Sequence, residues 1–519
     1  MMPPSICSGE VLALRRTLGG APDPLAIFAA LGDEAARANR LFFETEGRAF
    51  ILDAAAARVT CRGDEVELVA LSDNGRLVID AVRSRFGSQL VEDGEMRIKL
   101  RFPKATGDEP SARLLAPSPF DALREMVFGL KSLSPEEPFS IFAAGAIAFD
   151  HVDLVEDLPP AREDPLGFPD YQFWLAESLL VIEPGGTRVI CSAFGSGDKE
   201  KARRSFHAAC GRLERLVGLC SADAGRMRNL SEATRLSAPP PGVEPDCDMT
   251  DEEFAALVQS LKAHVEAGDV YQVVPSRTFK APCPDPLAAF AAQRAMDPSP
   301  YMFFLSAPDH VLFGASPECA VRVHGKKQPR VEVKPIAGTR ARGSGPDEDD
   351  RLEADLRLDA KELAEHMMLV DLARNDVARV SAAGTRRVDA LLSVVRYARV
   401  MHCVSVVSGE LAPGVDALRA LVACLNVGTL SGAPKLKATE LLRRFERQRR
   451  GPYGGALGWL AGSGELDSAV IIRSALVKDG IAHVRAGAGV VHDSVPLAEA
   501  SETRAKASAL LAAIESARQ

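Results

Sequence analysis

The sequence lacks the features that would define a membrane protein, a secreted disulfide-rich protein or a zinc protein. No stretch approaches the ~18 apolar residues of a membrane span, and the N-terminal segment Met1–Cys7 has no basic stretch followed by an apolar core. The ten cysteines are scattered without a Cys-x-x-Cys pair, which argues against a disulfide framework or a zinc site. We therefore expect a cytoplasmic protein with reduced thiols.

The charge balance is mildly acidic. The chain has 62 Lys and Arg against 71 Asp and Glu, a net charge of −9 at pH 7. Such a balance gives no general attraction to nucleic acid or to anionic membranes. The arginine-rich segment Arg443–Arg450 has no interleaved aromatic residues, and we interpret it as a solvated face or a subunit contact. An anionic substrate would have to be bound by local cations in a cleft.

The length and composition indicate a soluble globular protein of more than one domain. There are 519 residues, of which 46% are hydrophobic and 26% are charged. The clearest boundary is Ser237–Pro245, which has four prolines in nine residues and can be neither helix nor central strand. We predict an N-terminal domain over residues 1–245 and a C-terminal domain over residues 246–519.

Strand-like and helix-like segments alternate along the chain, which predicts an α/β or α+β fold with sizeable sheets. We interpret the acidic stretch Gly345–Asp350 as a solvated turn, and Thr250 with Glu253 as the start of a helix. Three hairpins are predicted: Leu179–Glu183 with Arg188–Ser192, Ala320–Val323 with Arg330–Lys334, and Ala469–Val477 with Ile481–Arg485. Further helices are predicted over Asp121–Leu133, Lys361–Ala373 and Leu497–Ile514.

Two of the predicted helices each carry a pair of glutamates three residues apart. Glu362 and Glu365 form one pair, and Glu499 and Glu502 form the other, so each pair lies on one face of its helix. Carboxylate oxygens are the ligands that Mg²⁺ prefers. The alternative is a solvated face whose charge is offset by nearby basic side chains. The pattern alone favours the solvated face and leaves the magnesium site open.

Glycines follow several strand-like runs and allow a ligand to approach the backbone. Pro335–Arg340 and Ala486–Val490 are two such segments, and Leu430–Lys435 is a turn of the same kind before a helix. Backbone N–H groups in such places can bind a carboxylate. Arg473 is a charge within the predicted strand Ala469–Val477, where its guanidinium suits a carboxylate, although an edge-strand surface arginine is an equal alternative.

Taken together, these segments resemble the large subunit of anthranilate synthase, within the chorismate-utilising enzymes. The first half matches more weakly than the second, through segments such as Leu41–Thr45 and Asp153–Pro159. In the second half the matching segments are Gly268–Arg277, Asp297–Phe304, Phe313–Glu318, Pro335–Thr339, Glu365–Asp376, Val400–His402, Gly428–Lys435, Tyr453–Ala456, Ile472–Ser474 and Gly487–Gly489.

The resemblance implies a fold and a chemistry. The fold would have two interwoven domains with large, mainly antiparallel sheets flanked by helices, and the reaction would convert chorismate and ammonia to anthranilate and pyruvate with Mg²⁺. Glu365 and Glu502 would be the principal Mg²⁺ ligands, with Glu362 and Glu499 close by, directly or through water. The residues that would bind chorismate are Gly338, Thr339, Tyr453, Arg473, Gly487, Ala488 and Gly489.

Four further residues acquire catalytic roles from the resemblance. Glu318 would be the general acid that protonates the departing C4 hydroxyl, and burial would raise its pKa. His402 and Thr429 resemble residues involved in the elimination of pyruvate. Gln272 stands where isochorismate-forming relatives carry a water-activating lysine, and Ala337 stands where aminodeoxychorismate synthases carry a lysine, so the anthranilate branch is favoured.

The resemblance also implies inhibition by tryptophan. Thr45 replaces the usual serine of the inhibitor site, and Ala469 stands where a cysteine is common, so an altered affinity is expected. The residues that match this site are Glu44, Thr45, Pro300, Tyr301 and Met302, and packing between domains is the alternative role for them.

A separate glutamine amidotransferase subunit is the implied partner. The chain ends shortly after the predicted helix that carries Glu499 and Glu502, so we expect ammonia to come from another chain. Three other functions stay open: an aminodeoxychorismate synthase component, an aminodeoxyisochorismate synthase that stops before pyruvate loss, and a non-catalytic regulatory subunit that binds tryptophan.

Overall fold

The computed structural model describes most of the chain. The described residues are 6–32, 38–104, 113, 115–160, 162–222, 246–325, 327–397 and 400–518. The proline-rich segment at 237–245 lies outside them, so the domain boundary placed there stays a prediction.

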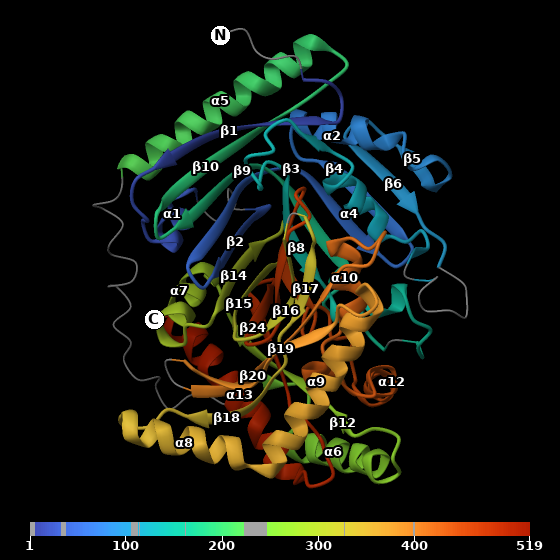
Figure 1. Ribbon diagram of the computed structural model, residues 1–519, viewed down its shortest axis with the longest axis vertical. Helices are drawn as coiled ribbons and strands as arrows, with labels where there is room; N and C mark the ends of the chain where they lie inside the picture. The colour runs from blue at the N-terminus through green and yellow to red at the C-terminus, as the bar shows by residue number, and fades with distance from the viewer. Residues whose placement is uncertain are drawn as a thin grey trace.

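Long strands dominate the first part of the chain, up to residue 222. Helix α5 crosses the outer side of β1 and β10 (Figure 1), and β9 is buried along nearly its whole length, as its continuous apolar run requires. The helices are α1 (Pro24–Ala30), α2 (Asp73–Arg83), α4 (Phe120–Val127) and α5 (Lys199–Ala222), with a 3₁₀ turn η2 (Gly87–Gln89) and another, η3 (Phe149–Leu154). The strands are β1 (Glu10–Leu18), β2 (Arg40–Thr45), β3 (Arg48–Arg62), β4 (Glu65–Ala70), β5 (Leu90–Asp93), β6 (Arg97–Arg101), β7 (Lys131–Ser132), β8 (Phe142–Ile147), β9 (Tyr171–Glu183) and β10 (Gly186–Phe194).

The second part, from residue 246 onward, adds more strands and the longer peripheral helices. The helices are α6 (Asp251–Glu266), α7 (Pro286–Met296), α8 (Pro346–Leu358), α9 (Ala360–Val380), α10 (Ala417–Cys424), α11 (Gly428–Ser431), α12 (Lys435–Phe445) and α13 (Pro496–Ser516). The strands are β11 (Asp246–Cys247), β12 (Gln272–Val273), β13 (Ser276–Pro282), β14 (Tyr301–Ser306), β15 (Val311–Ser316), β16 (Cys319–His324), β17 (Arg330–Val333), β18 (Ile336–Ala341), β19 (Arg387–Arg396), β20 (Val400–Glu410), β21 (Gly432–Ala433), β22 (Ala456–Ala461), β23 (Leu466–Val470), β24 (Ser474–Lys478) and β25 (Ile481–Gly487).

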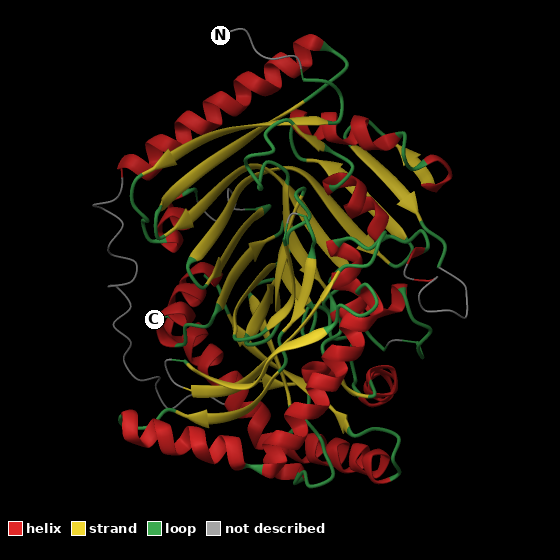
Figure 2. Ribbon diagram, in the orientation of Figure 1, coloured by secondary structure: helices red, strands yellow, loops and turns green. Residues whose placement is uncertain are grey.

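Hydrogen bonding joins the strands of both parts into one extended sheet system. Within the described residues, 23 strands are connected, and their pairings are antiparallel except for the short parallel contact of β1 with β7. The pairs β2–β14 and β8–β22 connect the first part of the chain to the second. Strands fill the middle of the molecule and helices lie around them (Figure 2), which confirms the predicted fold class.

An aromatic cluster packs the two parts of the chain together where β3, β8 and β22 meet. The ring of Phe142 stacks on Phe50 with centroids 5.3 Å apart and on Trp459 at 5.8 Å. Phe139 meets Phe50 and Trp459 edge-on. Aromatic pairs contribute beyond the area they bury, so this cluster fixes how β22 sits beside β8.

Several local predictions are confirmed. Thr250 and Glu253 form a reciprocal capping box at the start of α6. The helices predicted over Lys361–Ala373 and Leu497–Ile514 are present as α9 and α13. The structure adds that Asp359 caps α9 and that Pro496 occupies the first turn of α13. Strands β9 and β10 pair as a hairpin, and β16 pairs with β17.

Three local predictions are wrong. The helix predicted over Asp121–Leu133 ends at Val127, because β7 follows and pairs with β1. The acidic stretch Gly345–Asp350 is the first turn of α8, where its carboxylates face the positive end of the helix dipole. The strand predicted over Ala469–Val477 is divided into β23 and β24, and Arg473 between them has φ +49°.

The arginine-rich segment differs from the prediction in part. Arg444 and Arg447 are exposed, as a solvated face requires, but the side chains of Arg443 and Arg450 are buried. Arg443 lies 2.7 Å from Asp153, with its side chain only 7% exposed. Arg450 donates to Glu446 with two nitrogens, at 2.9 and 2.7 Å, and Arg485 lies 3.0 Å from the same carboxylate. Buried charges require such partners, so these arginines hold the fold together instead of forming a solvated face.

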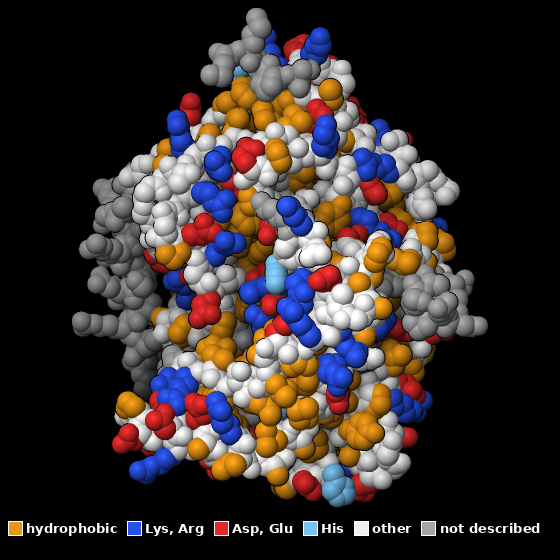
Figure 3. Space-filling view, in the orientation of Figure 1, with side chains coloured by type: hydrophobic (Ala, Val, Ile, Leu, Met, Phe, Trp, Pro, Cys, Tyr) orange, Lys and Arg blue, Asp and Glu red, His pale blue; other side chains and the backbone are white. Residues whose placement is uncertain are grey.

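The outer surface mixes charges of both signs. On the face drawn in Figure 3, basic and acidic side chains are interspersed and no large area has a single sign. No helix within the described ranges is both long and apolar enough to cross a membrane.

We predict that Glu446→Ala strongly destabilises the protein. The substitution leaves two buried guanidinium groups without their carboxylate, which typically costs about 3–5 kcal/mol. The measurement is the midpoint of urea unfolding followed by circular dichroism. The matched control is Glu200→Ala, which removes an exposed ion pair to Arg204 and is expected to leave the midpoint unchanged. Equal midpoints for the two variants would contradict the assignment.

Candidate functional site

The larger part of the predicted site comes together in one pocket of about 410 Å³. Its walls are helices α9 and α13, strands β18 and β25, and the connections that carry Glu318 and Arg473. Ala488 is the exception, because its side chain packs in the core and its N–H donates to the carbonyl of Pro275. The lining includes Gln272, Glu318, Gly338, Thr339, Glu362, Glu365, His402, Thr429, Tyr453, Arg473, Gly487, Gly489, Glu499 and Glu502.

Glu318 is a buried carboxyl group without a cation beside it among the described residues. It lies in the tight connection between β15 and β16, where its backbone N–H is 3.3 Å from Ser316 Oγ and its carbonyl accepts from Val470. Burial raises the pKa of Glu318 to about 7, although the hydroxyl of Thr429, 2.7 Å from Oε1, lowers it. The side chain is therefore poised to give or take a proton near neutral pH.

His402 lies on β20 and reaches the same pocket. Its Nδ1 is 2.9 Å from Thr339 Oγ1 on the neighbouring strand β18. Burial lowers the pKa of His402, so the imidazole is neutral at physiological pH. A neutral histidine beside a hydroxyl can accept a proton from a bound molecule.

The four predicted metal-binding glutamates face each other across the pocket from two helices. Glu362 and Glu365 project from α9, and Glu499 and Glu502 project from α13. Burial raises the pKa of Glu365 and, secondarily, the neighbouring charge of Glu362 raises it further. Burial raises the pKa of Glu499 as well, and Glu502 adds to the effect. Carboxylates of this kind are stabilised by a cation placed between them.

The donor set fits a hard divalent cation such as Mg²⁺. It consists of carboxylate oxygens from two helices beside an open cavity that leaves positions for water and substrate oxygens. Among the described residues no three potential ligands already converge on one point. Instead, neighbours hold three of the carboxylates: Gln272 Nε2 donates to Glu365 at 3.0 Å, Arg340 lies 3.2 Å from Glu362, and Lys506 lies 2.6 Å from Glu502.

The opposite wall is built to receive an anion. Arg473 presents a half-buried guanidinium, 40% exposed, at the pocket. Tyr453 is buried, which raises its pKa to about 12, so its hydroxyl stays protonated. A Cβ at Gly487 would lie 2.9 Å from that hydroxyl, and one at Gly489 would lie 2.7 Å from Gln272 Nε2. Glycine is required at both positions because a side chain would close the pocket.

Sequence reasoning missed two cationic residues of this pocket, Lys361 and Arg485, and considered Lys506 only as a basic side chain that offsets the charge of a solvated face. Lys506 donates to the carbonyl of Gly487 at 3.1 Å in addition to pairing with Glu502. Its spacing of four residues from Glu502 was the available signal. Arg485 lies in a strand that alternates between apolar and other residues, and its contact with Glu446 depends on tertiary structure.

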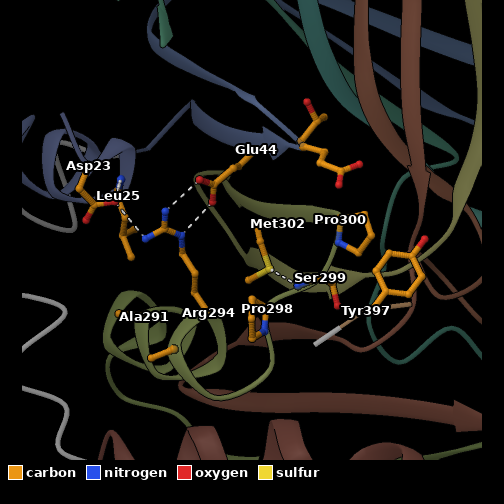
Figure 4. A pocket seen from close by; sticks show the side chains of 13 residues that line it. Asp23, Leu25, Glu44, Ala291, Arg294, Pro298, Ser299, Pro300, Met302 and Tyr397 are labelled. Atoms are coloured by element: carbon orange, nitrogen blue, oxygen red, sulfur yellow. Dashed lines mark hydrogen bonds and ion pairs between the residues drawn. The ribbon is translucent and has the colours of Figure 1, made fainter. Parts of the chain in front are cut away.

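A second pocket, of about 430 Å³, lies between β2, α1, the end of α7 and the loop before β14. Four of the residues predicted to bind an inhibitor line it: Glu44, Thr45, Pro300 and Met302. Figure 4 shows Glu44 and Met302 from adjacent strands and Pro300 at the start of β14. These two strands pair with Met302 opposite Glu44, which explains how residues so distant in sequence meet.

Tyr301, the fifth predicted inhibitor residue, has its side chain on the other face of β14. Successive side chains in a strand point to opposite faces, and Tyr301 donates to Asp467 at 3.1 Å within the core. Tyr301 is therefore not among the residues that line this pocket.

Sequence reasoning also missed Arg294, which pairs with both acidic residues Asp23 and Glu44 in the second pocket. Arg294 donates to both oxygens of Glu44, each at 2.8 Å, and to Asp23 at 3.0 Å (Figure 4). Arg294 is a single basic residue near the end of an otherwise apolar helix, which was the available signal. Asp23 is the N-cap of α1, and nothing in the sequence joins it to the distant helix.

Comparison with known proteins supplies the family. The sequence model of the chorismate binding enzymes matches residues 95–512. Anthranilate synthase component 1 of Vibrio cholerae is 44% identical, over 96% of this chain and 95% of the relative. The pyocyanine-specific anthranilate synthase component 1 of Pseudomonas aeruginosa is 42% identical, over 96% of this chain and 93% of the relative. The crystal structure of anthranilate synthase component I from Streptococcus pneumoniae is 29% identical, with a TM-score of 0.68, over 90% of this chain and 92% of the other.

The chain belongs to the chorismate binding enzymes. The match covers most of the chain and both helices that carry the four glutamates. Within that family it belongs to the anthranilate synthase component 1 proteins, which confirms the resemblance stated from the motifs.

We predict that Glu318 titrates near pH 7 and that Thr429→Val raises its pKa. The Thr429 hydroxyl stabilises the ionised form by a hydrogen bond, so its removal favours the protonated form. The measurement is the carboxyl C=O band in infrared spectra recorded from pH 5 to 9, assigned by its loss in Glu318→Gln. A Glu318 that is already ionised at pH 5.5 in the wild type would refute the prediction.

Proposed function

We propose that this chain converts chorismate and ammonia to anthranilate and pyruvate, as the large subunit of an anthranilate synthase. The observation that carries the proposal is Glu318, a carboxyl group with a pKa of about 7 at the floor of a pocket that has carboxylates on one wall and an arginine on the other. The identity of 40–44% to several proteins named anthranilate synthase component 1 supports the same reaction.

The substrate is a dicarboxylate, and the pocket offers two different places for its charges. One carboxylate would pair with Arg473 and accept from the hydroxyl of Tyr453 and from backbone N–H groups beside Gly487 and Gly489. The other would face the four glutamates, which repel it unless a cation lies between. Chorismate would thus be oriented because one carboxylate binds the protein's own arginine, while the other needs a bound cation.

The proton transfers use residues that are already in suitable protonation states. Glu318 would donate a proton to the C4 hydroxyl, so that the C–O bond breaks and water leaves as ammonia adds to the ring. The Thr429 hydroxyl orients the carboxyl group for that transfer. His402, neutral and bonded to Thr339, would then accept the proton released as pyruvate is eliminated and the ring becomes aromatic.

Mg²⁺ is the cofactor that the four glutamates would hold, with Glu365 and Glu502 as principal ligands. When bound, the ion neutralises the ring carboxylate and stabilises charge that develops there. Gln272 fixes the orientation of Glu365 through its amide. Lys506 would release Glu502 for the ion and would keep its hydrogen bond to the carbonyl of Gly487.

A glutamine amidotransferase subunit is the proposed source of ammonia. Ammonium is protonated at neutral pH and is not a nucleophile, so transfer through a closed route from a partner chain would keep it reactive. The component 1 designation of the relatives is consistent with such a partner. We assign the assembly to the cytoplasm, and the heterotetramer of two chains of each kind is the assembly we propose.

The second pocket is the proposed site of feedback inhibition by tryptophan. It offers Glu44 for an ammonium group and Pro300, Met302 and Leu25 for an apolar ring. One relative is named for pyocyanine, so the component name alone does not define the pathway. The inhibitor pocket is what supports placement in tryptophan biosynthesis, at its first committed step.

We predict that the purified chain forms anthranilate from chorismate, ammonium and Mg²⁺, and not from chorismate and glutamine. Anthranilate fluorescence is the measurement. A chelator is expected to abolish the signal, and Glu318→Gln to lower kcat by about 10²–10⁴-fold. The rate of the wild type is expected to fall as pH rises through about 7, because Glu318 then loses its proton.

Three results would contradict the proposal. Accumulation of a non-aromatic amino product would indicate an aminodeoxychorismate or aminodeoxyisochorismate synthase. Turnover with glutamine by the single chain would contradict the need for a partner. No reaction, together with tryptophan binding, would indicate a regulatory subunit.

We predict that tryptophan binds at the second pocket and that Glu44→Gln weakens binding about tenfold or more. The variant loses a charge-assisted hydrogen bond to the ligand ammonium group. Calorimetric titration is the measurement. Tyr301→Phe is the control and is expected to retain the wild-type Kd within about twofold, because its hydroxyl lies on the opposite face of β14. A Kd for tryptophan that is unchanged in Glu44→Gln would place the ligand outside the second pocket.

A further inference from the structure

The last turn of α7 and the residue after it lie between the two pockets. In this turn, Gln293–Asp297, Arg294 lines the second pocket, while Gln293 and Asp297 contact Arg473, the proposed substrate-binding residue of the first pocket. Neighbouring residues of a helix project about 100° apart. Residues of this one turn can therefore contact both the second pocket and Arg473.

On the substrate side, the turn holds Arg473 by its backbone and by its charge. Gln293 is buried, and its Nε2 donates to the carbonyl of Arg473 at 2.8 Å, while the N–H of Ala315 donates to the same carbonyl at 3.2 Å. Asp297 Oδ2 lies 3.7 Å from Arg473 Nη1. Arg473 has a positive φ, which a non-glycine residue adopts only when its surroundings hold it there.

On the side of the second pocket, Arg294 of the same turn pairs with the carboxylate of Glu44. Both oxygens of this carboxylate accept hydrogen bonds from Arg294, and the third contact of the guanidinium is with Asp23. An ammonium group that binds Glu44 shares the carboxylate with Arg294 and competes with it for the same negative charge. Binding thus changes a contact of this turn directly, which is the differential interaction that coupling between sites requires.

We propose that Gln293 and Asp297 are positioning residues for Arg473, and that the turn Gln293–Asp297 couples the occupancy of Glu44 to the affinity of Arg473 for the substrate carboxylate. The coupling part rests on the proposed function. Gln293 sets the direction of the guanidinium through the backbone, and Asp297 competes with the substrate for its charge. Displacement of Arg294 from Glu44 shifts the turn, and Arg473 then favours Asp297 over chorismate.

The positioning part is tested by steady-state kinetics of two variants. Gln293→Met keeps the volume and removes the donor, so the KM for chorismate is expected to rise about fivefold with kcat within twofold. Asp297→Asn keeps the shape and removes the competing charge, so KM is expected to fall about twofold with kcat unchanged. A merely structural role would raise KM or lower the melting temperature in both variants. Shifts of the same sign, or none, would overturn the positioning role.

The coupling part is tested by calorimetric titration of tryptophan with and without chorismate, ammonia being omitted. In the wild type the ratio of the two Kd values is expected to be at least about fivefold. In both variants the ratio is expected to approach one, while the Kd for tryptophan alone stays within twofold of the wild type. The matched control is Asp80→Asn, which removes an ion pair of 3.5 Å with Arg83 on α2, remote from both pockets, and is expected to retain the full ratio.

The outcomes distinguish failure of the proposed tryptophan inhibition from failure of the coupling through Gln293–Asp297. A wild type that binds no tryptophan refutes the proposed inhibition, and the opposite KM shifts then still decide whether Gln293 and Asp297 position Arg473. A wild type with antagonism that both variants retain in full refutes coupling through this turn.

Discussion

The antiparallel register of β14, β15 and β24 is the constraint on which both pockets depend. Tyr301 pairs with Ser316, and Gly314 pairs with Ser474, so the start of β14, the end of β15 and the start of β24 lie at one end of the sheet. Three short connections meet the strands there. One is the loop before β14 that lines the second pocket with Pro298 and Pro300, and the other two carry Glu318 and Arg473 of the first pocket. A shift of one residue in any of these pairings would turn each set of side chains to the opposite face.

Burial acts differently on the carboxyl groups of the first pocket, and this difference separates their roles. Among the described residues, the Glu318 carboxyl group is hydrogen-bonded to the hydroxyl of Thr429 alone, so desolvation is hardly offset and its pKa reaches about 7. Glu365 and Glu499 are less buried and lie among cations and amides, so their pKa values rise less. The same physical effect therefore gives one acid that can donate a proton and a group of carboxylates that attract a cation.

Many elements of the fold could be predicted from the sequence, because caps such as Thr250 and hairpin turns act over a few residues. The residues of the first pocket were predicted mainly through the resemblance to the family, since the spacing of Glu362 with Glu365 alone favoured a solvated face. The contacts of Arg294 and Arg485 could not be predicted, because their carboxylate partners come from elements far away in the chain. A charged residue in an apolar segment indicates that a partner exists, and only the tertiary structure identifies it.

The one strand that was predicted as continuous and is divided shows where function overrides local preference. Residues Ala469–Val477 alternate as a strand should, yet the chain leaves the extended conformation before Arg473, at a cost of about 1–3 kcal/mol for its positive φ. Contacts from Gln293 and Ala315 to the carbonyl of Arg473 offset that cost. In a continuous strand the side chain of Arg473 would point out of one face of the sheet, whereas the interruption lets its guanidinium line the first pocket. Because α7 holds this interruption through Gln293, a cation of the first pocket depends on a helix whose next side chain, Arg294, lies in the other pocket.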